Sequence, residues 1–260
     1  MKVFGALARL WKYRLVIQVL IARELKLRYH GTALGFLWSL LNPLILVSVY
    51  VLVFSVYLRV EMDNYAAFLL CGLLPWMWFS ASLAESGRAL IDNGALVKRA
   101  ALPSEIFPLV SVGSNLMHFL LSLPVLLALL AVLGIKLAWT ILLLPLVLLV
   151  QGLITLGLAL VCASLAMRFR DLLHIVPNVL LIWFFITPVF YPVNFVPTRF
   201  QGILLVNPMA YLIEAYHHIL FYRQAPPLWQ FGLLGGFAVT LVLAGYLVFE
   251  ARREALVEEV

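Results

Sequence analysis

The chain has 260 residues, of which 65% are hydrophobic and only 12% are charged, and its mean hydropathy is +1.06. Soluble domains carry about 25% charged residues, so this composition excludes a soluble protein and indicates an integral membrane protein. The net charge of +6 is attributed to membrane orientation, and since no basic face with interleaved aromatic residues belongs to a soluble module, we expect no nucleic-acid binding.

The first predicted element, residues 1–31, is an amphipathic helix lying on the membrane surface. Near its end Arg23, Lys26 and Arg28 can reach anionic headgroups, while Tyr29 and neighbouring leucines lie against the acyl boundary. A lipid-linked anion could be met here, or the charges could merely anchor and orient the first span. The apolar run 15–22 is followed by Arg23 without a small-residue cleavage site, so we expect no cleaved signal peptide.

Six apolar segments follow, each near or above the roughly 20 residues that cross a bilayer as a helix. They are residues 34–58, 65–84, 106–133, 137–167, 172–191 and 229–249. They are continuously apolar and lack the alternation of a membrane barrel. The predicted fold class is therefore an all-α integral membrane protein with six transmembrane helices in a single domain, residues 1–260.

The spans contain few polar side chains, and we expect these to form interhelical hydrogen bonds. They are Asn115, His118, Gln151 and Asn178. In the last span, Gly232 and Gly236 have the spacing that permits close helix packing. Cys71 and Cys162 lie inside spans without CxxC spacing or a companion His, so we interpret them as small buried hydrophobic residues and expect no metal site.

Two connections face the same side as the amino-terminal segment. Residues 86–103 are predicted to form a short amphipathic helix outside the membrane, which is either a docking element or a connector. Its polar side is formed by Arg88, Asp92, Lys98 and Arg99. The turn before the fifth span contains Arg170 and Asp171, which can pair with a partner or with each other, or serve topology alone.

The connection 192–228 is too long for a turn and too apolar for a solvated loop. Asn207 as cap and Pro208 as first helical residue predict a helix there. Two short helices that dip into the outer leaflet fit this segment and could line an exit, because polar groups at membrane depth face protein or water. The candidate residues are Pro192, Asn207, Pro208, Glu214 and His217.

Most of the 18 Lys and Arg residues lie in the amino-terminal segment, in these two connections and after the last span. The exceptions are Arg59, Lys136, Arg199 and Arg223. The positive-inside tendency therefore predicts that both termini are cytoplasmic.

Six motifs occur in a fixed order between about residues 20 and 220. They are RELKLRYHGTALGFLWSLLNPL, LLPWMWF, VKRAALPSEIFPL, FRDL, TPVFYP and NPMAYLIEAY. In this order they resemble the type-2 ABC transporter permeases that export polysaccharides, in particular the Wzm-like O-antigen permeases and their capsule and teichoic-acid relatives. The ordered set is more specific than any single motif.

The resemblance implies a half-transporter in the cytoplasmic (inner) membrane. Two copies of a six-span chain, a homodimer, would form the pore, and two copies of a separate Wzt-like ABC ATPase would bind ATP and Mg and power it. We expect no cofactor in this chain, which is a transporter subunit and not an enzyme. The sequence agrees, since no GxxxxGK[ST] motif occurs in it.

The resemblance also assigns roles to residues. Residues 1–31 become the gate helix, where Arg23, Lys26, Arg28 and Tyr29 would meet the pyrophosphate of a polyprenyl-linked polysaccharide. Residues 86–103 become the coupling helix, and residues 192–228 the outer gate. The implied contacts with the ATPase are Arg88, Asp92, Lys98, Arg99, Glu105, Arg170 and Asp171. Where relatives often have Arg after the NPM motif, this chain has His217 and His218, so a charge function there would depend on pH.

A sliding polymer needs weak, repeated binding, which aromatic faces can supply to sugar rings. The candidates are Trp38, Trp76, Trp78, Phe79, Phe184, Phe185, Phe190 and Tyr191. Alternatively, such residues only anchor the protein at the membrane interfaces.

Other functions remain open at this point. A permease of the same plan could export teichoic acid, a small lipid or a drug. A gradient-driven carrier would usually show acidic residues near the membrane midplane, and here these lie at span ends or in connections. A membrane enzyme would need a catalytic motif such as GxSxG or HExxH, and neither occurs.

Overall fold

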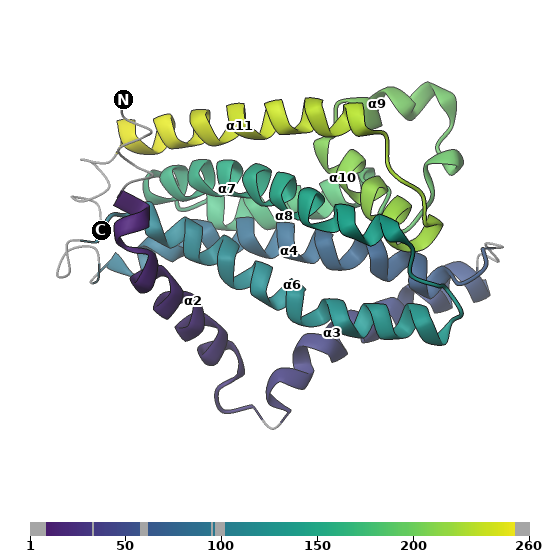
Figure 1. Ribbon diagram of the computed structural model, residues 1–260. Coiled ribbons are helices and arrows are strands. Elements are labelled where there is room, and N and C mark those ends of the chain that lie inside the picture. Colours follow the sequence, from purple (N-terminus) through teal and green to yellow (C-terminus); the bar gives the residue numbers. More distant parts are fainter. Residues whose placement is uncertain (1–8, 33, 58–61, 95, 97–101, 253–260) are drawn as a thin grey trace.

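The computed structural model describes residues 9–32, 34–57, 62–94, 96 and 102–252, without the side chains of Tyr29, Phe36, Ser39 and Leu40. This part of the chain is a bundle of helices without strands (Figure 1). The α-helices are α2 (Arg14–Tyr29), α3 (Trp38–Val51), α4 (Tyr65–Asp92), α6 (Ile106–Val132), α7 (Leu144–Arg168), α8 (Leu172–Ile186), α9 (Gln201–Leu205), α10 (Pro208–Tyr216) and α11 (Leu228–Ala251). Short 3-10 segments are η1 (Gly35–Leu37), η3 (Trp139–Leu143), η4 (Val193–Phe195) and η5 (Thr198–Phe200), and π-helical segments are η2 (Leu52–Tyr57) and η6 (His217–Tyr222).

A helix occurs at each predicted span, but the helices differ in length. Among the described residues, four are long and apolar enough to cross a membrane: Tyr65–Asp92, Ile106–Val132, Trp139–Arg168 and Leu228–Ala251. The apolar helices at the first and fifth predicted spans are shorter, Leu41–Tyr57 and Leu172–Ile186. The structure is thus that of a helical integral membrane protein with four candidate spans, and the count of six stays a prediction.

Two helix ends differ from the sequence-based boundaries for local reasons. The fifth span was expected to reach residue 191, but α8 ends at Ile186 because Thr187 precedes Pro188 and takes an extended conformation. The second span was expected to end at residue 84, but α4 continues to Asp92. Residues 86–92 of the predicted coupling helix are therefore the last turns of α4.

α4 occupies the centre of the bundle, with α6, α7 and α8 around it (Figure 1). It is the most buried of the four candidate spans. Phe68, Phe79 and Leu73 on α4 are almost fully buried in the main hydrophobic cluster. Since lipid tails are as apolar as these side chains, dense packing between helices is the main source of stability here.

α7 and α11 approach each other most closely at two glycines. A Cβ atom added to Gly157 would lie 2.9 Å from the carbonyl oxygen of Leu241, and one added to Gly245 would overlap the carbonyl oxygen of Gly157. By contrast, a Cβ on Gly232 or Gly236 would meet nothing within 4 Å. Among the described residues of one copy, no neighbour packs closely at Gly232 or Gly236, and Gly157 and Gly245 permit the close approach of α7 and α11 instead.

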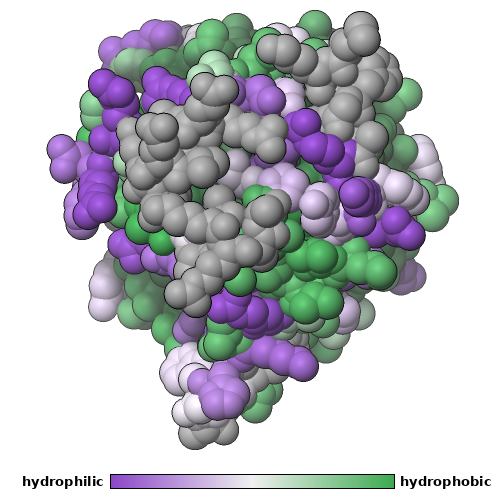
Figure 2. Space-filling model, turned by 90° about the vertical axis from the view of Figure 1, so that its left-hand side faces the viewer, coloured by the Kyte–Doolittle hydropathy of each residue, from purple (hydrophilic) through white to green (hydrophobic). Residues whose placement is uncertain are grey.

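One end of the bundle is polar. α2 begins and α11 ends there, at the left of Figure 1, and α4 and α7 also end there. Figure 2 shows this end face, on which many hydrophilic side chains lie among hydrophobic ones. We call it the basic end, because Arg9, Arg168, Arg170 and Arg252 lie in the segments that reach it.

Candidate functional site

The chain turns sharply between α2 and α3, which form a V in Figure 1. Two glycines in this turn, Gly31 and Gly35, have φ values of 78° and 51°. Such left-handed conformations cost glycine little and other residues considerably more. The HGTALG stretch is therefore well suited to a sharp reversal of the chain beside the basic end of α2.

Arg28 joins three helices through a closed set of contacts. Its Nη2 donates to Glu85 Oε1 on α4 at 2.6 Å, and its Nη1 donates to Asn115 Oδ1 on α6 at 3.0 Å. Asn115 Nδ2 in turn donates to Glu85 Oε2 at 2.6 Å. The interhelical bonding predicted for Asn115 is thus confirmed, and Glu85 is a partner that sequence reasoning missed.

A cavity of about 360 Å³ lies beside this cluster, between the V and helices α4 and α6. We call it the inner cavity. Arg28 and His118 line it together with Trp38 and Asn42. A guanidinium has five N–H donors, of which the bonds to Glu85 and Asn115 use two, so the remaining donors suit an anion. The cavity therefore combines a cationic group with aromatic and amide side chains.

The other predicted gate-helix residues do not line this cavity. Arg23 and Lys26 are exposed on α2, and the side chain of Tyr29 lies outside the described part of the structure. Leu20 and Ile21 of α2 pack against α6, where Ile21 lies beside Gly113. The described structure thus brings only Arg28 of the four into a defined polar site.

Glu105, predicted to contact an ATPase, is buried, with 3% of its side chain exposed. Its Oε1 accepts a hydrogen bond from Arg9 Nη2 at 3.1 Å, and the same Arg9 nitrogen also donates to the hydroxyl of Tyr246 at 3.0 Å. Arg9 further lies 3.9 Å from Glu250. Arg9 therefore joins Glu105 to α11 within the chain, and the pairing of Glu105 with Arg9 carried no local sequence signal.

Several other predicted coupling residues are exposed at the basic end. Arg88 and Asp92 lie on the last turns of α4, and Arg170 and Asp171 lie between α7 and α8. Lys98 and Arg99 lie outside the described residues. The exposed charges offer a polar surface to a partner at this end.

The predicted pore aromatics separate into two groups. Trp76, Trp78, Phe79, Phe184 and Phe190 are buried, each with less than one tenth of its surface exposed. The rings of Trp76, Phe79 and Phe184 pack around Trp183, Tyr50 and Phe190 between α3, α4 and α8. Trp38 and Phe185 are exposed, and Tyr191 is partly exposed. Within one copy, most of these rings therefore form core contacts.

The outer connection contains the predicted helix start. The side chain of Asn207 accepts a hydrogen bond from Met209 N at 3.0 Å, and Pro208 is the first residue of α10, so both predicted positions are confirmed. Asn207 also accepts from Trp183 Nε1 at 2.8 Å and donates to Thr187 Oγ1 at 3.0 Å. One side chain thus caps α10 and ties it to the end of α8.

The two histidines after α10 have different surroundings. His217 is buried, stacks on the Phe68 ring at 3.9 Å and bonds the Phe68 carbonyl oxygen through Nε2 at 3.1 Å. His218 lies 3.7 Å from Glu214. Burial lowers the pKa of His217, so this residue stays neutral at physiological pH. A pH-dependent charge at this place therefore stays a prediction for His218 and has no support at His217.

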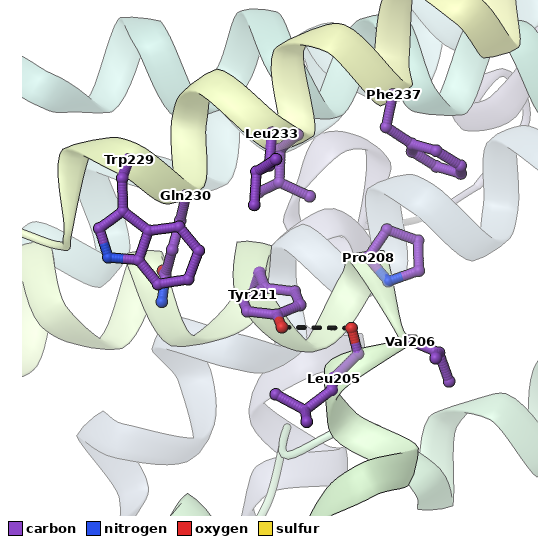
Figure 3. A pocket seen from close by; sticks show the side chains of 9 residues that line it. Leu205, Val206, Pro208, Tyr211, Trp229, Gln230, Leu233 and Phe237 are labelled. Atoms are coloured by element: carbon purple, nitrogen blue, oxygen red, sulfur yellow. Dashed lines mark hydrogen bonds between the residues drawn. The ribbon is translucent and has the colours of Figure 1, made fainter.

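A separate hollow has no charged side chain among the described residues that line it. It is an apolar groove of about 190 Å³ between α11 and the α9–α10 segment (Figure 3). Trp229, Leu233 and Phe237 of α11 face Pro208 and Tyr211 there, and the Tyr211 hydroxyl donates to the Leu205 carbonyl oxygen at 3.2 Å. The apolar lining of this groove suits contact with lipid tails.

Among the described residues, no group of three or more His, Cys, Asp or Glu side chains could hold a metal ion.

Comparisons with known proteins give a consistent result. Residues 16–221 match the protein family described as ABC-2 type transporter. The chain is 39% identical to the O-antigen export system permease protein RfbA of Myxococcus xanthus over 253 residues, which cover 96% of this chain and 97% of the relative. A Klebsiella pneumoniae protein of the same name is 33% identical over 78% of this chain and 79% of its own length. The polysialic acid transport protein KpsM of Escherichia coli is 22% identical over 94% of this chain and 95% of its own length.

Proposed function

The chain belongs to the ABC-2 type transporter family, and we propose that it is the membrane-embedded permease subunit of a polysaccharide exporter. The observation that carries this proposal is the 39% identity over 96% of the chain to a protein named as an O-antigen export permease. The weaker similarity to a polysialic acid transport protein supports the same substrate class.

The proposed unit is a homodimer in the cytoplasmic membrane, with six spans per chain and both termini in the cytoplasm. Two further spans would join the four long candidate spans. One would be formed by α3 together with η2, and the other by α8. α8 has 15 residues, fewer than the roughly 20 of a typical span, and its exposed face carries both apolar residues and Asn178. A face of this kind is better suited to a second protein copy or to water than to lipid.

Energy would come from two copies of a Wzt-like ABC ATPase, which would bind ATP and Mg, and this chain would hold no cofactor. The proposed docking surface is the basic end, with Arg88, Asp92, Arg170 and Asp171 exposed there. Lys98 and Arg99 are proposed members of the same surface. Glu105 would support it indirectly through its contact with Arg9.

The proposed substrate is an O-antigen-like polysaccharide linked to a polyprenyl pyrophosphate. Its pyrophosphate would be met by Arg28 at the inner cavity, with Arg23 and Lys26 attracting it from the surface of α2. The proposal for glycan-facing aromatics narrows to Trp38, Phe185 and Tyr191, because the other candidates are buried within one copy. The outer gate would consist of α9, α10 and η6.

A teichoic acid or a small lipid remains the alternative substrate, since a basic inner cavity beside an apolar bundle suits any amphiphilic anion. A gradient-driven carrier has less support, because the family match favours ATP-driven transport.

The test is co-purification of this chain with candidate ATPase subunits, followed by measurement of ATP turnover in nanodiscs with and without a polyprenyl-linked glycan. We expect the glycan to stimulate turnover, and the Lys98→Glu, Arg99→Glu variant to lose both ATPase association and stimulation. Association without a response to glycan would point to a different substrate. Failure of every candidate ATPase to associate would contradict the proposal.

A further inference from the structure

A second cavity of about 360 Å³ lies at the other end of the bundle from the basic end. It is bounded by the start of α4, by the segment after α8, and by α10 with η6. We call it the outer cavity. Besides the buried Phe68 and His217, its side chains include three aromatic rings, a carboxylate, an imidazole and an amide. They are Tyr191, Phe195, Tyr222, Glu214, His218 and Asn194.

The aromatic rings of the outer cavity are accessible to a ligand, and the backbone segments that carry them are held in place by contacts within the chain. Phe195 is 53% exposed and Tyr222 is 39% exposed. Tyr191 packs edge-on against Phe190 at 4.9 Å, and its hydroxyl donates to the Phe185 carbonyl oxygen at 3.1 Å. Exposed aromatic rings on a fixed wall can stack on the apolar faces of sugar rings. Because the wall is already ordered, binding costs the protein little conformational entropy.

Two further contacts fix the wall that faces these rings. The Tyr65 hydroxyl donates to the Phe190 carbonyl oxygen at 2.8 Å, which holds the segment after α8 against α4. His217 stacks on Phe68 and bonds its carbonyl oxygen, which holds η6 against α4. A Cβ at Gly72 would lie 2.9 Å from His217 Nε2, so the glycine leaves room for this ring. The cavity is therefore preformed within one copy of the chain.

The polar groups of the cavity remain available to a ligand. Glu214 Oε1 and His218 Nε2 are 3.7 Å apart, a long contact between side chains that are 35% and 23% exposed, so the carboxylate keeps most of its capacity to accept hydrogen bonds. A sugar hydroxyl can both donate and accept, and so could satisfy a carboxylate and either tautomer of an imidazole.

The charge of the lining decides which part of a lipid-linked glycan fits. None of the described residues that line the outer cavity is Lys or Arg, and Glu214 supplies a carboxylate. A phosphate group would be repelled there, whereas Arg28 favours it at the inner cavity. The two cavities thus have opposite preferences.

We infer that the outer cavity binds neutral, hydroxyl-rich sugar residues of the exported glycan as they leave the transporter. The inference rests on the proposed polysaccharide export and adds a site to it. At about 360 Å³ the cavity lies near the lower end of ligand-binding pockets, so it takes a short stretch of the polymer. Binding is weak and renewed with each advance of the chain.

The test is photo-cross-linking in cells that export the polysaccharide. Phe195→p-benzoylphenylalanine places the probe in the outer cavity, and Phe237→p-benzoylphenylalanine in the apolar groove of Figure 3 is the matched control, since the two side chains are 53% and 46% exposed. We expect a glycan adduct at position 195 and only lipid adducts at position 237. Lipid adducts alone at position 195, in cells whose export depends on this chain, would overturn the inference and leave the proposed function intact.

A second measurement does not depend on the probe being tolerated. Oligosaccharides released by mild acid from the exported polysaccharide are titrated into the purified native chain, and binding is followed by saturation-transfer NMR. We expect Glu214→Gln to weaken binding about five-fold, because a charged acceptor is replaced by a neutral one, and Trp229→Leu on α11 in the apolar groove to leave binding unchanged. Equal binding by the native and Glu214→Gln chains would overturn the inference. Absence of any polysaccharide export that depends on this chain would overturn both the inference and the proposed function.

Discussion

Arg28 joins α2 to α4 and α6 and also borders the inner cavity, so its two roles need to be separated. Its pair with Glu85 is partly open to solvent, with 30% and 44% of the two side chains exposed. Exposed ion pairs usually contribute ~0.2–1 kcal/mol. The pair is therefore a modest restraint on α2, and the free donors of Arg28 are the feature that suits an anionic substrate.

Variants of the two partners distinguish restraint from binding. Arg28→Gln removes the guanidinium, while Glu85→Gln keeps it and removes only the carboxylate. We expect Arg28→Gln to lower export about ten-fold or more, because a charge-assisted contact with phosphate is lost, and Glu85→Gln to retain most of it. The measurement is the amount of surface polysaccharide per cell, with Arg28→Lys as a control that keeps the charge. Equal losses for Arg28→Gln and Glu85→Gln would show that only the ion pair matters.

His217 gives a prediction about pH. Burial lowers its pKa in the folded chain, whereas the unfolded side chain has a pKa near 6.5. Below about pH 6.5 the unfolded state takes up a proton that the folded state does not, so stability is full above this pH and falls as the pH drops. Each unit of pH below this value lowers the free energy of unfolding by up to about 1.4 kcal/mol.

We therefore expect the Tm of the purified chain to fall between pH 7.5 and 5.5, and to fall less in His217→Gln. The glutamine amide can still donate to the Phe68 carbonyl oxygen, although the stacking on the ring is lost. The measurement is thermal unfolding of both proteins in the same detergent at each pH. The same pH dependence in both would argue against a neutral, buried His217.

At the level of helices, the contact of α7 with α11 is the most sensitive to small changes. Gly245→Ala would place a methyl group against the backbone of Gly157, and overpacking of this kind costs ~1–3 kcal/mol. We expect the Tm of Gly245→Ala to fall by several degrees. Gly236→Ala on the same helix is the control, since its Cβ would meet nothing within 4 Å and alanine favours a helix. A Tm for Gly245→Ala no lower than that of the control would contradict this packing.

The helices themselves could be predicted from the sequence, because apolar runs of this length have few alternatives in a membrane. The start of α10 was also predictable, since the cap by Asn207 and the position of Pro208 depend on adjacent residues. The glycine contact was not, because it depends on which helix lies opposite, and Gly232 had the right spacing but no neighbour.

The candidate site was predictable in part, for a similar reason. A basic α2 with Arg28 near its end follows from composition and periodicity. The partner Glu85 lies 57 residues further along the chain, and Asn115 lies 87. Asn178 was expected to bond another helix, yet it donates to His174 within α8 and is exposed. Such pairings depend on three-dimensional packing. For Asn178 on the exposed face of α8, they also depend on the neighbour of the chain in the assembled transporter.

At the scale of the whole molecule, the exposed face of α8 is the proposed contact with a second copy. Asn178, Ile182 and Phe185 follow one another at helical spacing, and the last two are 62% and 52% exposed. A symmetric dimer uses the same surface on both subunits. A polar side chain in the middle of this face argues against contact with lipid tails alone.

Cysteine cross-linking tests this arrangement. In a background with Cys71→Ala and Cys162→Ala, we expect Ile182→Cys and Phe185→Cys chains to form covalent dimers in membranes with a short bis-maleimide reagent. Leu233→Cys, on α11 and 67% exposed, should give few or none. Dimers from Leu233→Cys with none from the α8 variants would place the contact on α11 instead. The yields are read from denaturing gels.

The contacts of Arg9 have a consequence for how the chain is made. Arg9 bonds Tyr246, which lies 237 residues later in the sequence. Ribosomes add ~5–20 residues per second, so the nascent amino-terminal segment waits on the order of ten seconds or more before this partner exists. Until α11 enters the membrane, Glu105 and Arg9 can pair only without the hydroxyl that completes their contacts. The last helix to be translated therefore closes the first segment into place, and a chain cut short before α11 exposes that unfinished junction to the proteases that remove incomplete products.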